Sequence, residues 1–210
     1  MPSVLALYAG GAGTLDMPSG PIATAIAKRP VAGRVRVEAL GLPGDEQVHP
    51  THGGPDRAVC VYPREHYARW DARVAPAFGE NVTSAGVLEE TTRIGDVWRI
   101  GGALLQVTQP RSPCGKVAAR LGIPDLVMQA RRSRATGLHL RVLEPGELGA
   151  GDAIELVEPA AHGISVAQAV AARFDPAPDP GLVRAVLDVP ELALEWRAKT
   201  APRLAAAEAA

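Results

Sequence analysis

The chain has 210 residues, of which 47% are hydrophobic and 21% charged, a balance typical of a globular protein with one or two domains. It carries 22 Lys and Arg residues against 23 Asp and Glu residues, which argues against nucleic acid or a membrane surface as the main partner. Two cysteines exclude a disulfide scaffold. No basic segment precedes Lys28 and no apolar run approaches roughly 20 residues, so we expect a cytoplasmic protein.

Glycine and proline, at 22 and 19 residues, divide the first 162 residues into short apolar segments. This pattern favours short strands joined by turns over long helices. The expected elements are the strands Val4–Tyr8, Arg34–Val37, Ala58–Tyr62, Val97–Ile100, Ala103–Thr108, Leu138–Leu143 and Ile154–Leu156, and a short helix over Arg64–Trp70. Strands at this spacing predict a closed or nearly closed β-barrel.

After residue 162 the pattern changes to helices. Ser165 can cap a helix that ends near Phe174, and Asp179 followed by Pro180 marks the start of a second helix. A third helix follows Pro190. We therefore expect a mainly β fold with some α-helix, in which a barrel domain (residues 1–162) precedes a three-helix module (residues 163–210). The module has no basic recognition helix, so DNA binding is not its expected role.

Two histidines three residues apart, His49 and His52, lie in the most polar stretch of the predicted barrel, Gly44–Tyr67. Their spacing fits two ligands of a zinc ion, but the sequence shows no obvious second pair of ligands. Turn histidines that hydrogen-bond the backbone are the alternative.

A pair of glycines in the same stretch suits a bound anion. Gly53 and Gly54 follow His52, and backbone amides without side chains can approach an anion closely. Arg57 offers a planar fork suited to phosphate, and Asp56 beside it can hold that fork in place. A glycine-rich turn with a local Asp56–Arg57 ion pair is the structural alternative.

A stiffened loop after a predicted strand contains one of the two cysteines. In the segment Gln106–Lys116, prolines on both sides of Arg111 restrain the backbone, and Cys114 comes near the end. Arg111, Lys116 and the start of a helix would favour the thiolate, the form that acts as a nucleophile or binds a soft metal. Cys60 lies within an apolar strand and is expected to fill the core.

A third polar stretch contains Glu80 and Asn81. The amide of Asn81 can hold a polar heterocycle, because it offers both donors and an acceptor. Glu80 is either a proton carrier or a structural anchor, and the sequence does not decide between the two roles.

Together these stretches resemble the MOSC superfamily, and within it the stand-alone YiiM-like branch. The tail from about residue 163 is similar to the three-helix module that often follows this domain. A lone HGG or PC motif would mean little, whereas the ordered set is specific. The matching pieces cover about Gly41 to Leu156 and are, in the family's order, GLPGDEQ, THGGPDRAVCVYPREHY, FGENVT, IGDVWRIGGALLQVTQPRSPCGK and RVLEPGELGAGDAIEL.

The resemblance implies a MOSC-type β-barrel that binds molybdenum cofactor, a metal dithiolene pterin with a phosphate tail. In the family a single cysteine is the protein ligand of molybdenum, and the matching position here is Cys114. Gly53, Gly54, Arg57 and Arg111 are then expected to contact the phosphate or the pterin of the cofactor.

Members resembling this chain reduce N-hydroxylated compounds, including N-hydroxylated purine bases. The expected partners are therefore a small N-hydroxylated substrate and a separate flavin or iron–sulfur electron-donor protein, because Cys60 and Cys114 cannot build an iron–sulfur cluster. His52, Asn81 and Cys114 would rim the reactive centre as catalytic residues at one mouth of the barrel, with His52 delivering protons. A homodimer is one assembly that the sequence leaves open.

Two other classes of protein stay open. A binding module would carry the cofactor, or relay sulfur through a persulfide on Cys114, without catalysing reduction. A regulatory protein would use the barrel as a scaffold and the helical tail as its contact surface.

Overall fold

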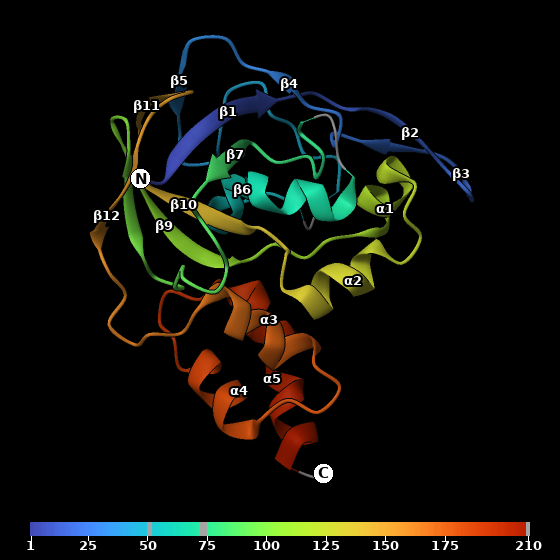
Figure 1. Cartoon of the computed structure of the whole chain (residues 1–210), viewed down its shortest axis with the longest axis vertical. Helices are drawn as coiled ribbons and strands as arrows, with labels where there is room; N and C mark the ends of the chain where they lie inside the picture. Colours follow the sequence, from blue (N-terminus) through green and yellow to red (C-terminus); the bar gives the residue numbers. More distant parts are fainter. Residues whose placement is uncertain (50–51, 72–74, 209–210) are drawn as a thin grey trace.

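The computed structural model describes residues 1–49, 52–71 and 75–208, and its main feature is a sheet of eight strands that curls on itself (Figure 1). In spatial order the strands are β12 (Ile154–Glu158), β8 (Val97–Ile100), β9 (Ala103–Pro110), β10 (Leu138–Glu144), β6 (Val59–Pro63), β7 (Val82–Ala85), β1 (Ser3–Ala9) and β4 (Arg29–Pro30). A bridge between Ser3 and Ala153 links β1 to the segment before β12. The sheet therefore forms the nearly closed barrel that the sequence predicts.

Two small sheets accompany the barrel. β5 (Arg34–Val37) pairs with β11 (Gly146–Gly149), and β2 (Gly13–Met17) forms a hairpin with β3 (Gly20–Thr24) that reaches toward the helices after β9 (Figure 1). Sequence patterning did not predict β2 and β3, because few of their side chains are buried and no apolar face marks them.

The predicted hairpin between β8 and β9 is confirmed, and Gly101 shows why its turn needs glycine. Its φ of +57° lies in the left-handed region, and a Cβ there would collide with the carbonyl oxygen of Glu147. Pairing of Val97 with Gln106 and Ile100 with Ala103 fixes the register of the hairpin. The hairpin places the end of β9 beside the cavity described below.

Three helical segments cover one end of the barrel. The predicted helix Arg64–Trp70 is a 3-10 helix, α1 spans Gly115–Leu121, and α2 spans Leu126–Ser133. Sequence patterning did not predict α2, which is rich in polar residues. These segments surround a second apolar core that includes Tyr62. Among the described helices, none is both long and apolar enough to cross a membrane.

The C-terminal segment forms the three predicted helices, α3 (Val166–Phe174), α4 (Pro180–Leu187) and α5 (Leu194–Glu208). The Ser165 side chain accepts a hydrogen bond from the backbone N–H of Gln168 in a capping box. Figure 1 shows the helices below β9, where they share one apolar core with the sheet.

Leu138 tests how strongly this core stabilises the sheet. Its side chain is fully buried in β10, so Leu138→Ala is expected to lower the free energy of unfolding by about 2–5 kcal/mol. Chemical denaturation measures the change. Leu156 on β12 is 54% exposed, so Leu156→Ala is a matched control expected to cost about 0.5 kcal/mol or less. Equal losses in the two variants would contradict this assignment of the core.

Candidate functional site

A cavity of about 460 Å³ lies where the barrel loops, α1, α2 and the three-helix module meet. Its volume falls in the range of small-molecule sites, about 300–1,000 Å³. The barrel loops and strands contribute most of its lining, and α1, α2, α3 and α5 contribute the rest. The charged and polar side chains that line it include Lys28, Asp45, Glu46, Gln47, His52, Arg57, Cys60, Asn81, Gln109, Arg111, Cys114, Lys116, Arg131, His139, Arg173, Glu195, Trp196 and Lys199.

The cavity brings together six of the seven residues that sequence analysis selected. They are His52, Gly53, Arg57, Asn81, Arg111 and Cys114. The prediction for Gly54 is the exception, because Gly54 lines a neighbouring hollow of about 220 Å³ instead of the main cavity. Arg57 and Gly53 line both spaces, so the glycine turn lies between them.

Cys114 is a free, half-buried cysteine in the loop after β9. It is the N-cap residue of α1, with extended backbone (φ −124°, ψ 169°), and its carbonyl oxygen accepts the N–H of Val117 at 3.0 Å. The Cys114 side chain makes no capping hydrogen bond. The thiol is therefore left for a ligand of the cavity.

Cys60 differs from the core-filling residue expected from its strand. It is buried in β6 as expected, with 7% of the residue exposed, but it also lines the cavity. Burial raises the pKa of the Cys60 thiol, despite the opposing charge of Arg111. A neutral thiol is a poor metal ligand, so Cys114 remains the better candidate for this role.

Arg111 offers a buried donor to the cavity. One terminal nitrogen, Nη2, donates to the carbonyl oxygen of Phe78 at 2.6 Å, and the guanidinium lies 5.6 Å from the Phe78 ring centroid. The other, Nη1, is buried and has no hydrogen-bond partner among the residues that the structure describes. A buried unpaired donor is costly, and an anion in the cavity would satisfy it.

The expected Asp56–Arg57 ion pair is wrong. Asp56 pairs with Arg141 at 2.9 Å, and Arg57 pairs with Glu195 of α5. The two residues belong to a 3-10 turn, Pro55–Arg57, in which adjacent side chains point in different directions. Arg57 therefore ties the glycine turn to the three-helix module.

A buried ion pair fixes one wall of the cavity. Lys28 and Asp45 lie 2.5 Å apart, with 9% and 5% of their side chains exposed. Asn81 Nδ2 donates to Asp45 at 2.8 Å and to the carbonyl oxygen of Tyr8, and Asn81 Oδ1 accepts the N–H of Cys60. These bonds show that Asn81 positions the wall. Its predicted contact with a substrate stays a prediction.

Glu80 is a structural anchor and not a residue of the cavity. It accepts the N–H of Phe78 at 2.9 Å and the hydroxyl groups of Thr83 and Tyr67. The carboxylate is fully buried and does not line the cavity. This arrangement decides between the two roles that the sequence left open.

His52 favours the neutral form. Partial burial, followed by the charges of Lys116 and its neighbours, lowers the pKa of His52. The His49 and His52 rings lie 5.2 Å apart, but no group of three metal-ligating side chains occurs among the described residues. The geometry therefore gives no support to a zinc site built by these histidines.

Sequence reasoning missed the part of the site that the helices supply. Arg131 comes from α2, Arg173 from α3, and Glu195 and Lys199 from α5. No local motif marks these residues, because only the packing of the module on the barrel brings them to the cavity. Gln109, in contrast, lies in the segment Gln106–Lys116, so its position in the same motif as Cys114 could have identified it.

The lining of the cavity is strongly basic. Among its described residues are seven Lys and Arg side chains and three carboxylates. Because Glu195 is shared between Arg57 and Lys199, the carboxylates do not neutralise every cation. Such a cavity favours an anionic ligand.

Comparison with known proteins identifies the family. A model of the MOSC domain matches residues 48–155, which is more than half of the chain. The chain therefore belongs to the MOSC family, whose domain is like the C-terminal domain of molybdenum-cofactor sulfurases. A model of the YiiM-like, 3-alpha helix domain matches residues 164–207, so the chain has the organisation of the YiiM-like members.

Individual relatives agree with this assignment. Protein YiiM of Escherichia coli (strain K12) is 44% identical over 143 residues, 64% of each chain. The crystal structure of YiiM from Geobacillus stearothermophilus matches with a TM-score of 0.81 and 30% identity, over 97% of this chain and 100% of that one. A protein named reductase, from Gibberella moniliformis, is 36% identical over 148 residues, 66% of this chain and 26% of the relative.

His139 on β10 gives a pH test of the site. Burial, followed by the charge of Arg111, lowers the pKa of His139 well below 6.5, so the folded protein keeps the ring neutral. In the unfolded chain, His139 binds a proton below about pH 6.5, whereas in the folded protein it does not. Protonation therefore favours the unfolded chain, so the free energy of unfolding is highest above this pH and decreases as the pH falls below it.

We expect His139→Gln to make the free energy of unfolding less dependent on pH between about pH 5 and pH 7. Denaturation curves at several pH values measure this dependence for both proteins. Parallel pH profiles for the variant and the parent would contradict the prediction.

Proposed function

We propose that this protein is a molybdenum-cofactor-dependent reductase of N-hydroxylated compounds, such as N-hydroxylated purine bases, with Cys114 as the protein ligand of molybdenum. The observation that carries the proposal is a free, half-buried thiol in a basic cavity of a MOSC-family protein. The relative named reductase supports the reaction class.

The residues of the cavity fit the cofactor. A thiolate suits molybdenum, since soft sulfur ligands bind such metals well. Arg111 Nη1 is a buried donor without a partner among the described residues, and the positive lining suits an anionic pterin phosphate. The side-chain oxygen of Gln109 is likewise buried without a partner among these residues, and can accept an N–H of the pterin. Arg57 and the N–H of Gly53 complete the proposed contacts.

The reaction converts an N–OH group and two electrons and two protons into an N–H group and water. When bound, the cofactor supplies the two electrons, and a separate flavin or iron–sulfur protein restores them. His52 at the rim of the cavity delivers a proton to the departing oxygen. Because its pKa is lowered, its protonated form is a stronger acid than ordinary imidazolium and releases the proton readily.

Cys114→Ser is expected to abolish molybdenum binding and to leave the fold intact, because a hydroxyl is a harder and weaker ligand than a thiolate. Elemental analysis of protein from a host that makes the cofactor measures the bound metal. Cys60→Ser is the matched control, because it changes the other cysteine of the cavity and is expected to retain the metal. Metal at the parent stoichiometry in Cys114→Ser would refute the ligand assignment.

Turnover is the direct test of the reductase. Cofactor-loaded protein, given an artificial reductant and 6-hydroxylaminopurine, is expected to form adenine, which chromatography detects. His52→Gln is expected to lower the rate most at acidic pH, where a His52 with a lowered pKa is protonated and can donate, and least above neutral pH, where its ring is already neutral. Loaded and reduced protein that yields no amine from any hydroxylamine would exclude the reductase and favour a cofactor carrier.

A further inference from the structure

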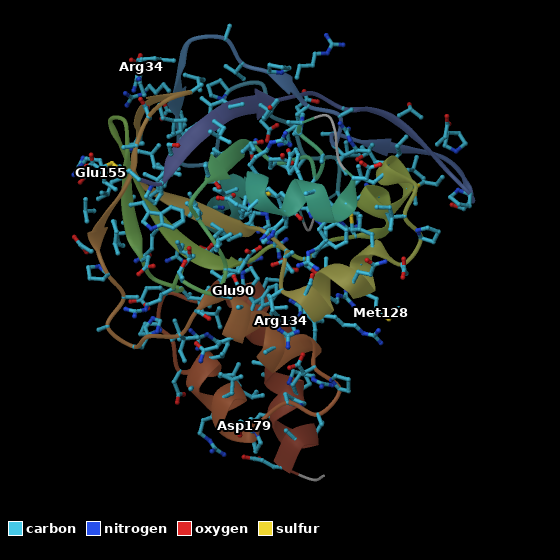
Figure 2. All side chains as sticks on the ribbon, in the orientation of Figure 1. Arg34, Glu90, Met128, Arg134, Glu155 and Asp179 are labelled. Atoms are coloured by element: carbon cyan, nitrogen blue, oxygen red, sulfur yellow. The ribbon has the colours of Figure 1, made fainter. Side chains whose placement is uncertain are left out.

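Two arginines of the cavity form no ion pair with a carboxylate of the described residues. Arg131 near the end of α2 and Arg173 near the end of α3 both line it. No carboxylate or carbonyl of the described residues accepts a hydrogen bond from either guanidinium, and Arg131 Nε is buried without a partner. Figure 2 labels Arg134 where α2 meets the module, and its 2.7 Å ion pair with Asp175 holds the ends of α2 and α3 together.

Aromatic rings hold the two guanidinium groups in place. The Arg131 guanidinium lies 4.1 Å from the centroid of Phe174, and that of Arg173 lies 4.9 Å from Phe174 and 4.4 Å from Trp196. Stacking covers the faces of the guanidinium groups and leaves their N–H donors at the edges. The pair is thus oriented before any ligand arrives, as a fork for an anion requires.

The charge around this pair is unbalanced. Burial, followed by the charge of Arg131, lowers the pKa of Arg173 to about 10. The carboxylate that acts on Arg173 is Glu195, and this group already pairs with Arg57 and Lys199. Two partly buried cations that form no ion pair with a described carboxylate are costly, and a bound anion removes the cost.

The pair is separate from the cations near Cys114. Arg111 follows β9 and lies against the Phe78 ring, and Lys116 lies on α1. Arg131 on α2 and Arg173 on α3 both lie against the Phe174 ring instead. The cavity therefore has two basic regions, one on the barrel loops and one on α2 and α3.

We propose that Arg131 and Arg173 form a subsite for the phosphate of the substrate, so that the preferred substrates are N-hydroxylated nucleotides rather than free bases. This inference rests on the proposed reductase function. The barrel-loop region holds the cofactor, and the arginine pair receives the phosphate of a nucleotide whose base reaches toward Cys114.

The test compares three substrates of cofactor-loaded protein: 6-hydroxylaminopurine, its ribonucleoside and the 5′-monophosphate of that nucleoside. We expect kcat/KM to be about tenfold or more higher for the monophosphate than for the nucleoside. Arg131→Gln and Arg173→Gln are each expected to remove about tenfold of this preference. Arg132→Gln, at an exposed neighbour on α2 outside the cavity, is the matched control and retains the preference.

The alternative is that the two arginines bind the phosphate of the cofactor instead of that of the substrate. The molybdenum and pterin content of each variant tests this alternative. Equal content in all variants, with loss of the preference in the two cavity variants alone, supports the proposal. Loss of cofactor from these variants with an unchanged preference would assign the arginines to the cofactor's phosphate and overturn it. Equal losses of kcat/KM for all three substrates, or no preference in the parent, would also overturn it. Arg131→Gln decides alone if Arg173→Gln, which loses contacts with two rings, does not fold.

Binding without turnover keeps this inference separate from the reductase. Calorimetry of the loaded protein with AMP and adenosine measures the phosphate contribution directly. Tighter binding of AMP, weakened in Arg131→Gln and unchanged in Arg132→Gln, supports the subsite even if no hydroxylamine is reduced. Equal binding of AMP and adenosine to the parent overturns it, whether or not 6-hydroxylaminopurine is reduced.

Discussion

The cavity depends on the packing of the three-helix module against the barrel. Trp196 of α5 and Ala169 of α3 belong to the same apolar core as Leu105 of β9, so the helices and the sheet bury one another's surfaces. The Arg57–Glu195 ion pair joins the two parts at the rim of the cavity. Removal of α5 would therefore have two effects: it would expose that core, and it would open one wall of the cavity.

This arrangement divides the work between a rigid barrel and charged helices. The barrel holds Arg111 directly after β9, where its backbone N–H donates to the carbonyl oxygen of Gly137 and its side chain to that of Phe78, and Cys114 follows in the loop that leads into α1. The helices add Arg173 and Lys199, whose positions are set by packing against aromatic rings and by ion pairs. The barrel thus supplies the thiol for the proposed chemistry, and the helices supply positive charge for recognition of the ligand.

Local patterns predicted six of the eight strands of the main sheet, but not β4 and β7, together with the module and the loop of Cys114, because short-range periodicity and turn chemistry determine these features. They failed where tertiary packing decides. Arg57 was assigned to its neighbour Asp56, yet its partner is Glu195, which is 138 residues away in the sequence. Arg173 carries no local signal of a site, since its role depends on which surface α3 presents to the barrel.

The bridge between Ser3 and Ala153 has a consequence for synthesis of the protein. β1 leaves the ribosome before the segment that it bridges, and the barrel cannot close until about 150 further residues have followed, which takes about 8–30 seconds at roughly 5–20 residues per second. The wall formed by Glu195 and Lys199 comes later still. The complete cavity can therefore enclose a ligand only after translation has passed residue 199.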